Sequence, residues 1–297
     1  MTSIAKQLLI PPSGFPDLGP GEAIALNKMV DVIRRHYELA GFVPIETPLV
    51  ERPEILFAKR EGEIKTQVDG LRLMNPAPGA KDDSKDLALR FDQTVPLARF
   101  VAGNLGNLSF PFRRYVIGPV FRGERPKDGR YRQFIQADID AIGDGDLDLL
   151  NDAEMVSVIA GIFTELAIGD FTIRIGNRKI LLGLLRSIGL RSDEAVTKAL
   201  SAVDRIEKVG FTNVQESLIT LGASENAVHD LLRLIGAERS TDDTLAELRA
   251  RDFDAVFKEG VQEISSVVEA IRQLGVPENR FCVDISIARG FDYYTGT

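Results

Sequence analysis

The feature that most limits the fold is a run of alternating side chains, residues 115–141, interrupted once by the loop RPKDGR. Side chains of a strand point alternately to its two faces, so the run predicts two strands joined by that loop. On the first strand, Arg122 and Glu124 share a face. On the returning strand one face carries Phe134, Gln136, Asp138 and Asp140, and the other carries Ile135, Ala137 and Ile139. One face is therefore polar, and its reverse is apolar and suited to a core.

The side chains of the polar face suit a nucleotide. Arginine offers a planar fork of donors that matches phosphate geometry, and an aromatic ring such as Phe134 can stack on a base. A plain hairpin with a solvated face is the alternative, but it would carry mixed Lys and Glu with scattered Thr. From Arg113 to Arg132 there are seven basic residues and two acids, on a chain with a net charge of −8. We interpret this cluster as a candidate anion site on an acidic protein.

The remaining pattern predicts an α+β fold in which a helical block interrupts the strands. Helices are expected at 22–40, 95–103 and 149–167, and extended chain at 42–51. Residues 87–95 alternate, which predicts a strand with Arg90, Asp92 and Thr94 on one face. We predict three parts, namely a core at 1–191, a helical insertion domain at 192–274 and a return to the core at 275–297.

Composition excludes several classes of protein. The 297 residues include one cysteine and two histidines, which rules out an internal disulfide and argues against a zinc enzyme. No run approaches the ~20 apolar residues of a membrane span. The first ten residues lack the features of a signal peptide. We therefore expect a cytoplasmic protein that does not bind membranes.

Residues 121–140, FRGERPKDGRYRQFIQADID, resemble motif 2 of class II aminoacyl-tRNA synthetases in the form found in histidyl-tRNA synthetases. The resemblance implies a class II antiparallel sheet flanked by helices. It also implies that Arg122 binds the α-phosphate of ATP, Glu124 lies near adenine, Phe134 stacks on adenine and Arg130 reaches the terminal phosphates. Gln136 and Asp140 match positions that hold the bound histidine, although many bacterial members have Glu where this chain has Asp140.

Two further segments resemble the same family. ISIARGFDYYTGT, residues 285–297, is similar to its histidine-specific motif. This similarity implies that Arg289 contacts the α-phosphate opposite Arg122, and that Tyr293 and Tyr294 line the imidazole pocket. LRFDQTVPLAR, residues 89–99, is similar to the segment that holds the α-ammonium group of the substrate, through Asp92, Gln93 and Thr94.

The resemblance implies a histidine–tRNA ligase. In that reaction the histidine carboxylate attacks the α-phosphate of ATP, with Mg²⁺ bridging the other phosphates, and the histidyl group is then transferred to tRNA(His). Arg122 and Arg289 are the expected catalytic residues. The long helix with Pro48 looks like motif 1, which implies a homodimer, and the helical block looks like the insertion domain that approaches tRNA.

Two alternatives remain open. A similar protein serves as the non-catalytic regulatory subunit of ATP phosphoribosyltransferase in histidine biosynthesis, but Arg122, Glu124, Gln136 and Arg289 favour the enzyme. The family also continues into motif 3 and an anticodon-binding domain, neither of which precedes Thr297. We therefore expect a shortened chain with weak or no activity by itself.

Overall fold

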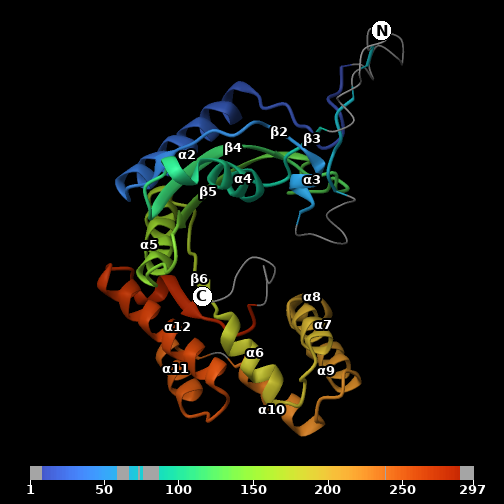
Figure 1. Ribbon diagram of the computed structural model, residues 1–297, viewed down its shortest axis with the longest axis vertical. Coiled ribbons are helices and arrows are strands. Elements are labelled where there is room, and N and C mark those ends of the chain that lie inside the picture. Colours follow the sequence, from blue (N-terminus) through green and yellow to red (C-terminus); the bar gives the residue numbers. More distant parts are fainter. Residues whose placement is uncertain (1–8, 59–66, 73, 76–86, 238, 288–297) are drawn as a thin grey trace. The chain divides into compact units, whose positions relative to one another are not determined.

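A computed structural model describes residues 9–58, 67–72, 74–75, 87–237 and 239–287. By its internal contacts the chain divides into two compact units, Met1–Leu147 and Asp148–Thr297. Described residues of the first unit form strands β1 to β5 and three helices, and those of the second form a mainly helical body with two short strands (Figure 1).

The first unit is built around a long hairpin. Its helices are α2 (Pro20–Leu39), α3 (Pro53–Leu56) and α4 (Thr94–Asn104), followed by a 3-10 turn at Leu105–Asn107. Its strands are β1 (Val43–Pro44), β2 (Val50–Glu51), β3 (Ala88–Leu89), β4 (Phe112–Phe121) and β5 (Gln133–Ile142). β4 and β5 pair antiparallel over their full length, β1 runs parallel to β4 at the edge, and β2 pairs antiparallel with β3. The predicted hairpin is confirmed.

Helix α2 packs along the apolar side of the hairpin (Figure 1). The rings of Tyr37 on α2 and Tyr115 on β4 lie 5.7 Å apart. The Tyr115 hydroxyl donates to Glu38 Oε1 at 2.8 Å, and the Tyr37 hydroxyl donates to the carbonyl of Ala137 at 3.1 Å. Since Tyr115 pairs with Ile139 across the ladder, this side carries the apolar set. The opposite side of the hairpin is the polar face.

The strand predicted for residues 87–95 is wrong beyond Leu89. β3 ends at Leu89, although the backbone N–H of Arg90 still donates to the carbonyl of Leu49 at 2.9 Å. Helix α4 begins at Thr94, and Asp92 Oδ1 accepts from the backbone N–H of Val95 at 3.1 Å. A carboxylate that accepts from the first turn stabilises a helix start. The shared face predicted for Arg90, Asp92 and Thr94 therefore does not form.

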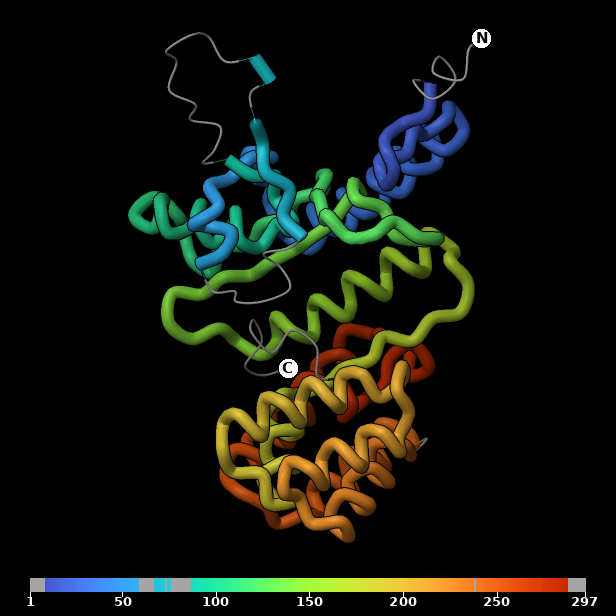
Figure 2. The backbone as a smooth tube through the Cα atoms, turned by 90° about the vertical axis from the view of Figure 1, so that its right-hand side faces the viewer, coloured from blue at the N-terminus to red at the C-terminus, as the bar shows by residue number. Residues whose placement is uncertain are grey.

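The second unit is helical, as predicted for its central block. Its helices are α5 (Leu150–Glu165), α6 (Arg178–Ser187), α7 (Asp193–Val203), α8 (Ile206–Val209), α9 (Phe211–Thr220), α10 (Glu225–Ile235), α11 (Thr241–Arg249) and α12 (Ala255–Gln273). Two short strands, β6 (Ile173–Ile175) and β7 (Phe281–Val283), pair parallel, with a 3-10 turn at Glu278–Arg280 before β7. Figure 2 shows helices α7 to α10 beside one another, in yellow to orange, and α9 contacts each of its three neighbours.

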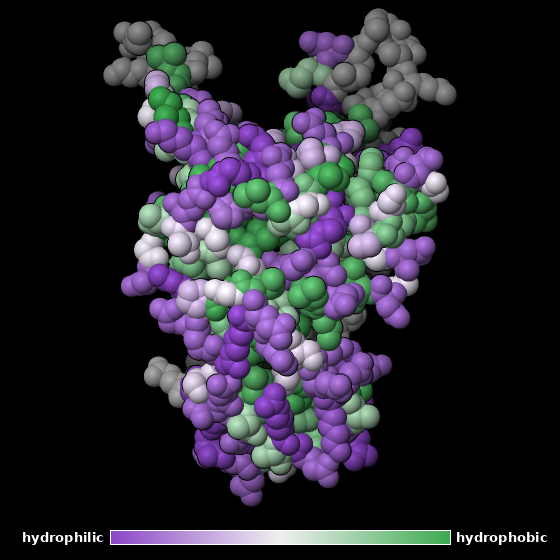
Figure 3. All heavy atoms as spheres, turned by 90° about the vertical axis from the view of Figure 1, so that its left-hand side faces the viewer, coloured by the Kyte–Doolittle hydropathy of each residue, from purple (hydrophilic) through white to green (hydrophobic). Residues whose placement is uncertain are grey.

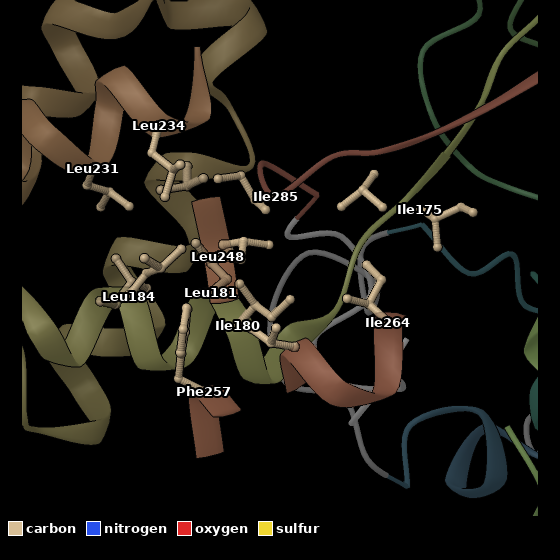
Figure 4. Packing of buried hydrophobic residues seen from close by; sticks show 14 of the residues in the cluster. Ile175, Ile180, Leu181, Leu184, Leu231, Leu234, Leu248, Phe257, Ile264 and Ile285 are labelled. Carbon is tan, nitrogen blue, oxygen red and sulfur yellow. The ribbon is translucent and has the colours of Figure 1, made fainter. Parts of the chain in front are cut away.

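One apolar core runs through the second unit, from Ala153 to Ile285. At its centre α12 crosses α6, where Phe257 meets Leu184 and Leu181 (Figure 4). The helices can approach this closely because position 183 is glycine. A Cβ added at Gly183 would lie only 2.4 Å from Cβ of Phe257. This core includes residues on both sides of positions 192 and 275, and the predicted division at these positions stays a prediction.

Among the described helices, none is both long enough and apolar enough to cross a membrane. The surface in Figure 3 mixes hydrophilic side chains with smaller hydrophobic areas. Such mixing agrees with a chain in which 27% of residues are charged.

Candidate active site

The polar face of the hairpin orders its side chains by the register of β4 and β5. From one end to the other, Arg114 pairs with Asp140, Val116 with Asp138, Gly118 with Gln136 and Val120 with Phe134. Arg122 follows directly after β4. The face therefore has an acidic end, a central glycine and an end that carries an aromatic ring and an arginine.

At the aromatic end, Arg122 lies over the ring of Phe134, with the guanidinium carbon 5.1 Å from the ring centroid. Its Nε donates to the carbonyl of Phe91 at 3.2 Å, which fixes the base of the guanidinium fork. In the adjoining loop, Arg130 Nη1 donates to Glu124 Oε2 at 2.8 Å. A guanidinium beside a half-buried ring is suited to a phosphate next to a base.

At the acidic end, one arginine meets several carboxylates. The Arg114 side chain is 0% exposed and forms an ion pair with Asp140, which is 31% exposed. Gln136 Nε2 donates to Asp138 Oδ2 at 3.0 Å. Buried Asp92 acts electrostatically on Asp138, Asp140 and Arg114. Three carboxylates therefore share the field of one guanidinium, which leaves the acidic end with an excess of negative charge.

Burial makes these charges costly. It raises the pKa of Asp138 to about 6, helped by the neighbouring Asp140, while Arg114 and the Gln136 hydrogen bond oppose the rise. Burial likewise raises the pKa of Asp140, against the pull of Arg114. Carboxylates held together against their own repulsion are typical of a site that binds a cation or moves a proton.

The centre of the face holds hydrogen-bond acceptors without donors. Gln93 is buried and donates through Nε2 to the carbonyl of Gly118 at 3.2 Å. Within the described residues, the side-chain oxygens of Gln93 and Gln136 are buried and accept no hydrogen bond. An unpaired buried acceptor costs about 1–3 kcal/mol. Two of them on one face suit a ligand that brings N–H donors.

Position 118 leaves little room for a side chain. A Cβ there would lie 3.0 Å from Nη2 of Arg90. Arg90 cannot give way easily, since its Nε donates to the carbonyl of Pro119 at 2.9 Å and its Nη1 to that of Thr47 at 3.0 Å. The missing side chain therefore lets the Arg90–Gln93 segment close over the polar face.

The structure brings together six of the predicted site residues, Asp92, Gln93, Arg122, Phe134, Gln136 and Asp140. Thr94 opens helix α4, and Glu124 and Arg130 pair with each other in the loop. Arg289, Tyr293 and Tyr294 lie outside the described residues. Among the described residues, no group of three or more His, Cys, Asp or Glu side chains is arranged to hold a metal ion.

Sequence reasoning assigned no role to two residues of the site, Asp138 and Arg114, and its basic cluster included one residue that lies elsewhere. Asp138 shares the face, and the alternation that placed Asp140 there also pointed to it. Arg114 was counted only in the basic cluster, because its partner Asp140 depends on the ladder register. Arg113 belonged to the same cluster, but it lies on the other face, where Nη2 donates to the carbonyl of Ala40 at 3.0 Å and the guanidinium covers Phe42.

Comparison with known proteins identifies the family of the chain. The family model described as histidyl-tRNA synthetase matches residues 14–297. The chain belongs to the histidyl-tRNA synthetase family. A histidine–tRNA ligase of Clostridium tetani is 43% identical over 295 residues, which is 99% of this chain. One of Nostoc sp. is 44% identical over 298 residues, or 96% of this chain.

Solved structures agree. The crystal structure of histidyl-tRNA synthetase from Nostoc sp. PCC 7120, 40% identical, matches with a TM-score of 0.84 over 97% of this chain and 63% of that one. The predicted fold class, an α+β antiparallel sheet flanked by helices, is thereby confirmed. A structure from Bacillus halodurans, described as an ATP phosphoribosyltransferase regulatory subunit/histidyl-tRNA synthetase, has a TM-score of 0.81 but is 21% identical, so it shows the fold alone. The chain spans 64% of the length of the two ligases.

Proposed function

We propose that this chain is the amino-acid-activating part of a histidine–tRNA ligase. The observation that carries the proposal is the charge order along one sheet face. Arg122 and Phe134 stand at one end, three carboxylates stand at the other, and two unpaired amide oxygens lie near the middle. Histidine and ATP joined at the α-phosphate have the complementary order of a base, phosphates and a donor-rich amino acid.

In the proposed reaction, an oxygen of the histidine carboxylate attacks the α-phosphorus of ATP. The new O–P bond forms as the bond to pyrophosphate breaks, and pyrophosphate leaves with the electron pair of that bond. Arg122 binds the α-phosphate and stabilises charge that develops on its oxygens, while Phe134 stacks on adenine. Arg289 is proposed for the opposite side of the same phosphate, and Glu124 and Arg130 for adenine and the terminal phosphates.

The acidic end is proposed to hold the amino acid. Asp92, Gln93 and Thr94 receive the α-ammonium group, and Gln136 and Asp140, with Tyr293 and Tyr294, receive the imidazole ring. An imidazole presents one donor and one acceptor nitrogen when neutral, so an amide and a carboxylate together can read it. The excess negative charge also favours the ammonium over an uncharged analogue.

The other substrates and partners are also proposals. Mg²⁺ would arrive with ATP as part of the substrate, bridging its phosphates. Transfer of the histidyl group would go to tRNA(His), the helical block would approach this tRNA, and the chain would act in the cytoplasm as a homodimer. The relatives that are more than 40% identical are ligases, which favours this reading over the regulatory-subunit alternative.

Histidine-dependent exchange of labelled pyrophosphate into ATP tests the proposal. We would measure it on the 297-residue chain and on a chain extended to the length of its relatives. We expect exchange with histidine and not with other amino acids, stronger in the longer chain. If neither chain exchanges and neither binds histidine, the proposal is wrong. Arg289→Ala should abolish exchange and leave the unfolding midpoint unchanged.

A further inference from the structure

Arg114 is buried beneath the acidic end of the face. Its side chain is 0% exposed, while the directly opposed Asp140 keeps 31% of its side-chain surface. Only the carboxylate can therefore contact a molecule that lies on the face. Arg114 reaches a ligand solely through Asp140 and the field it exerts on Asp138 and Asp92.

Burying a charged pair costs free energy of folding, so we expect Arg114 at this position only where its charge has a function. Removing one partner of a buried ion pair leaves the other partner uncompensated and is strongly destabilising. Asp138 repels Asp140 from two positions along the same strand, and Arg114 opposes that repulsion. An apolar residue at position 114 would have served a simple core, as Val116 and Val120 do next along β4. The charge at position 114 thus points to the carboxylates that it restrains.

We infer that Arg114 is a positioning residue for amino-acid binding, which fixes Asp140 and offsets the charge of Asp138 without touching the substrate. This inference rests on the proposed function, because Asp140 is assigned there to the histidine. It adds a specific dependence between the two strands. Arg114 on β4 and Asp138 on β5 should act as a compensating pair, so that losing both is milder than losing Arg114 alone.

The test is a double-variant cycle on the extended chain, with Arg114→Met, Asp138→Asn and the combination. KM for histidine and KM for ATP are measured separately by pyrophosphate exchange, and histidine binding by calorimetry. We expect Arg114→Met to raise the KM for histidine about ten-fold or more, with a much smaller change in the KM for ATP. Adding Asp138→Asn should recover a large part of the loss, because without Arg114 the charge of Asp138 displaces Asp140, whereas with Arg114 present the same substitution only removes a charge that favours the ammonium group.

The matched control is Arg113→Met, which removes the neighbouring arginine from the opposite face of the same strand. It should lower stability without changing the KM for histidine. If Arg114→Met changes both KM values alike, or if Asp138→Asn restores nothing, Arg114 is only structural and the inference is overturned. If the unsubstituted chain neither binds nor activates histidine, the proposed function fails first, and this inference fails with it.

Discussion

The two compact units bury different kinds of side chain. Among the described residues, the buried charged side chains, Glu51, Arg90, Asp92 and Arg114, all lie in the first unit. The buried polar residues of the second unit are Asn177, Thr241 and Thr244, set around one continuous apolar core. Buried charge costs free energy unless it is paired, whereas apolar burial stabilises a fold. Buried charge at the polar face therefore lowers the stability of the first unit, whereas packing of the apolar core raises that of the second.

The largest expected effect concerns the core of the second unit. Phe257 is 1% exposed and packs against α6, so Phe257→Ala should lower the free energy of unfolding by about 3–5 kcal/mol. Chemical denaturation followed by circular dichroism measures the change. Ile168→Ala, at a side chain that is 51% exposed, is the matched control and should change little. A loss below about 1 kcal/mol for Phe257→Ala would contradict the contrast between the units.

In the first unit we expect the opposite result, a loss of activity without a loss of stability. Arg122→Ala should lower the rate of histidine-dependent pyrophosphate exchange about 10²–10³-fold, because one preorganised donor to the developing charge is lost. The unfolding midpoint should stay nearly constant, since Arg122 is only half-buried. Arg122→Lys should recover little, as an ammonium lacks the planar fork. If Arg122→Ala lowered the free energy of unfolding as much as Phe257→Ala, Arg122 would be a core residue instead.

The comparison also explains what the sequence could predict. Alternation along 121–140 placed Phe134, Gln136 and Asp140 on one face, because strand geometry has a fixed period of two. The helical character of the second unit followed from its apolar spacing, and Ser192 caps helix α7 by accepting a hydrogen bond from the backbone N–H of Ala195. Both predictions follow from local rules, which held for these two segments.

What could not be predicted depends on contacts between distant segments. The Arg114–Asp140 pair requires the register of β4 against β5, and the Gln93 hydrogen bond to Gly118 requires a loop to fold over the hairpin. Residues 90–95 alternate like a strand, yet Asp92 accepts from the N–H of Val95 and a helix begins. At this segment a local helix cap, and not a distant contact, outweighed an alternating pattern that is too short to decide.

A smaller effect on stability concerns Asp152 of the second unit. Its pKa is raised to about 6, as is that of Asp138 in the first unit. The pKa of Asp152 on α5 is raised mainly by burial, with a contribution from the charge of Glu263. Because the pKa of Asp152 in the folded protein lies above its ordinary value of 3.8, its protonated form stabilises the fold below about pH 4, and this stabilisation is lost as the pH rises through about 6. Asp152→Asn should therefore stabilise the second unit by about 1 kcal/mol at pH 7 and not at pH 4. Thermal unfolding across that range measures it, and an equal shift at both pH values would exclude the titration as its cause.

The smallest effect concerns Asp138 and the KM for histidine. The pKa of Asp138 is also raised, but its side chain lies on the polar face of the hairpin and not in an apolar core. Protonation below about pH 6 removes one negative charge from the acidic end, so the KM for histidine should rise as pH falls. Asp138→Asn removes that charge at every pH. The ratio of variant to unsubstituted KM should be about two- to five-fold at pH 8 and approach one at pH 5.5. Taking the ratio cancels the titration of free histidine, whose imidazole has a pKa in the same range. If the ratio is the same at both pH values, Asp138 does not titrate at the face, and the two raised aspartates would differ only in where they are buried.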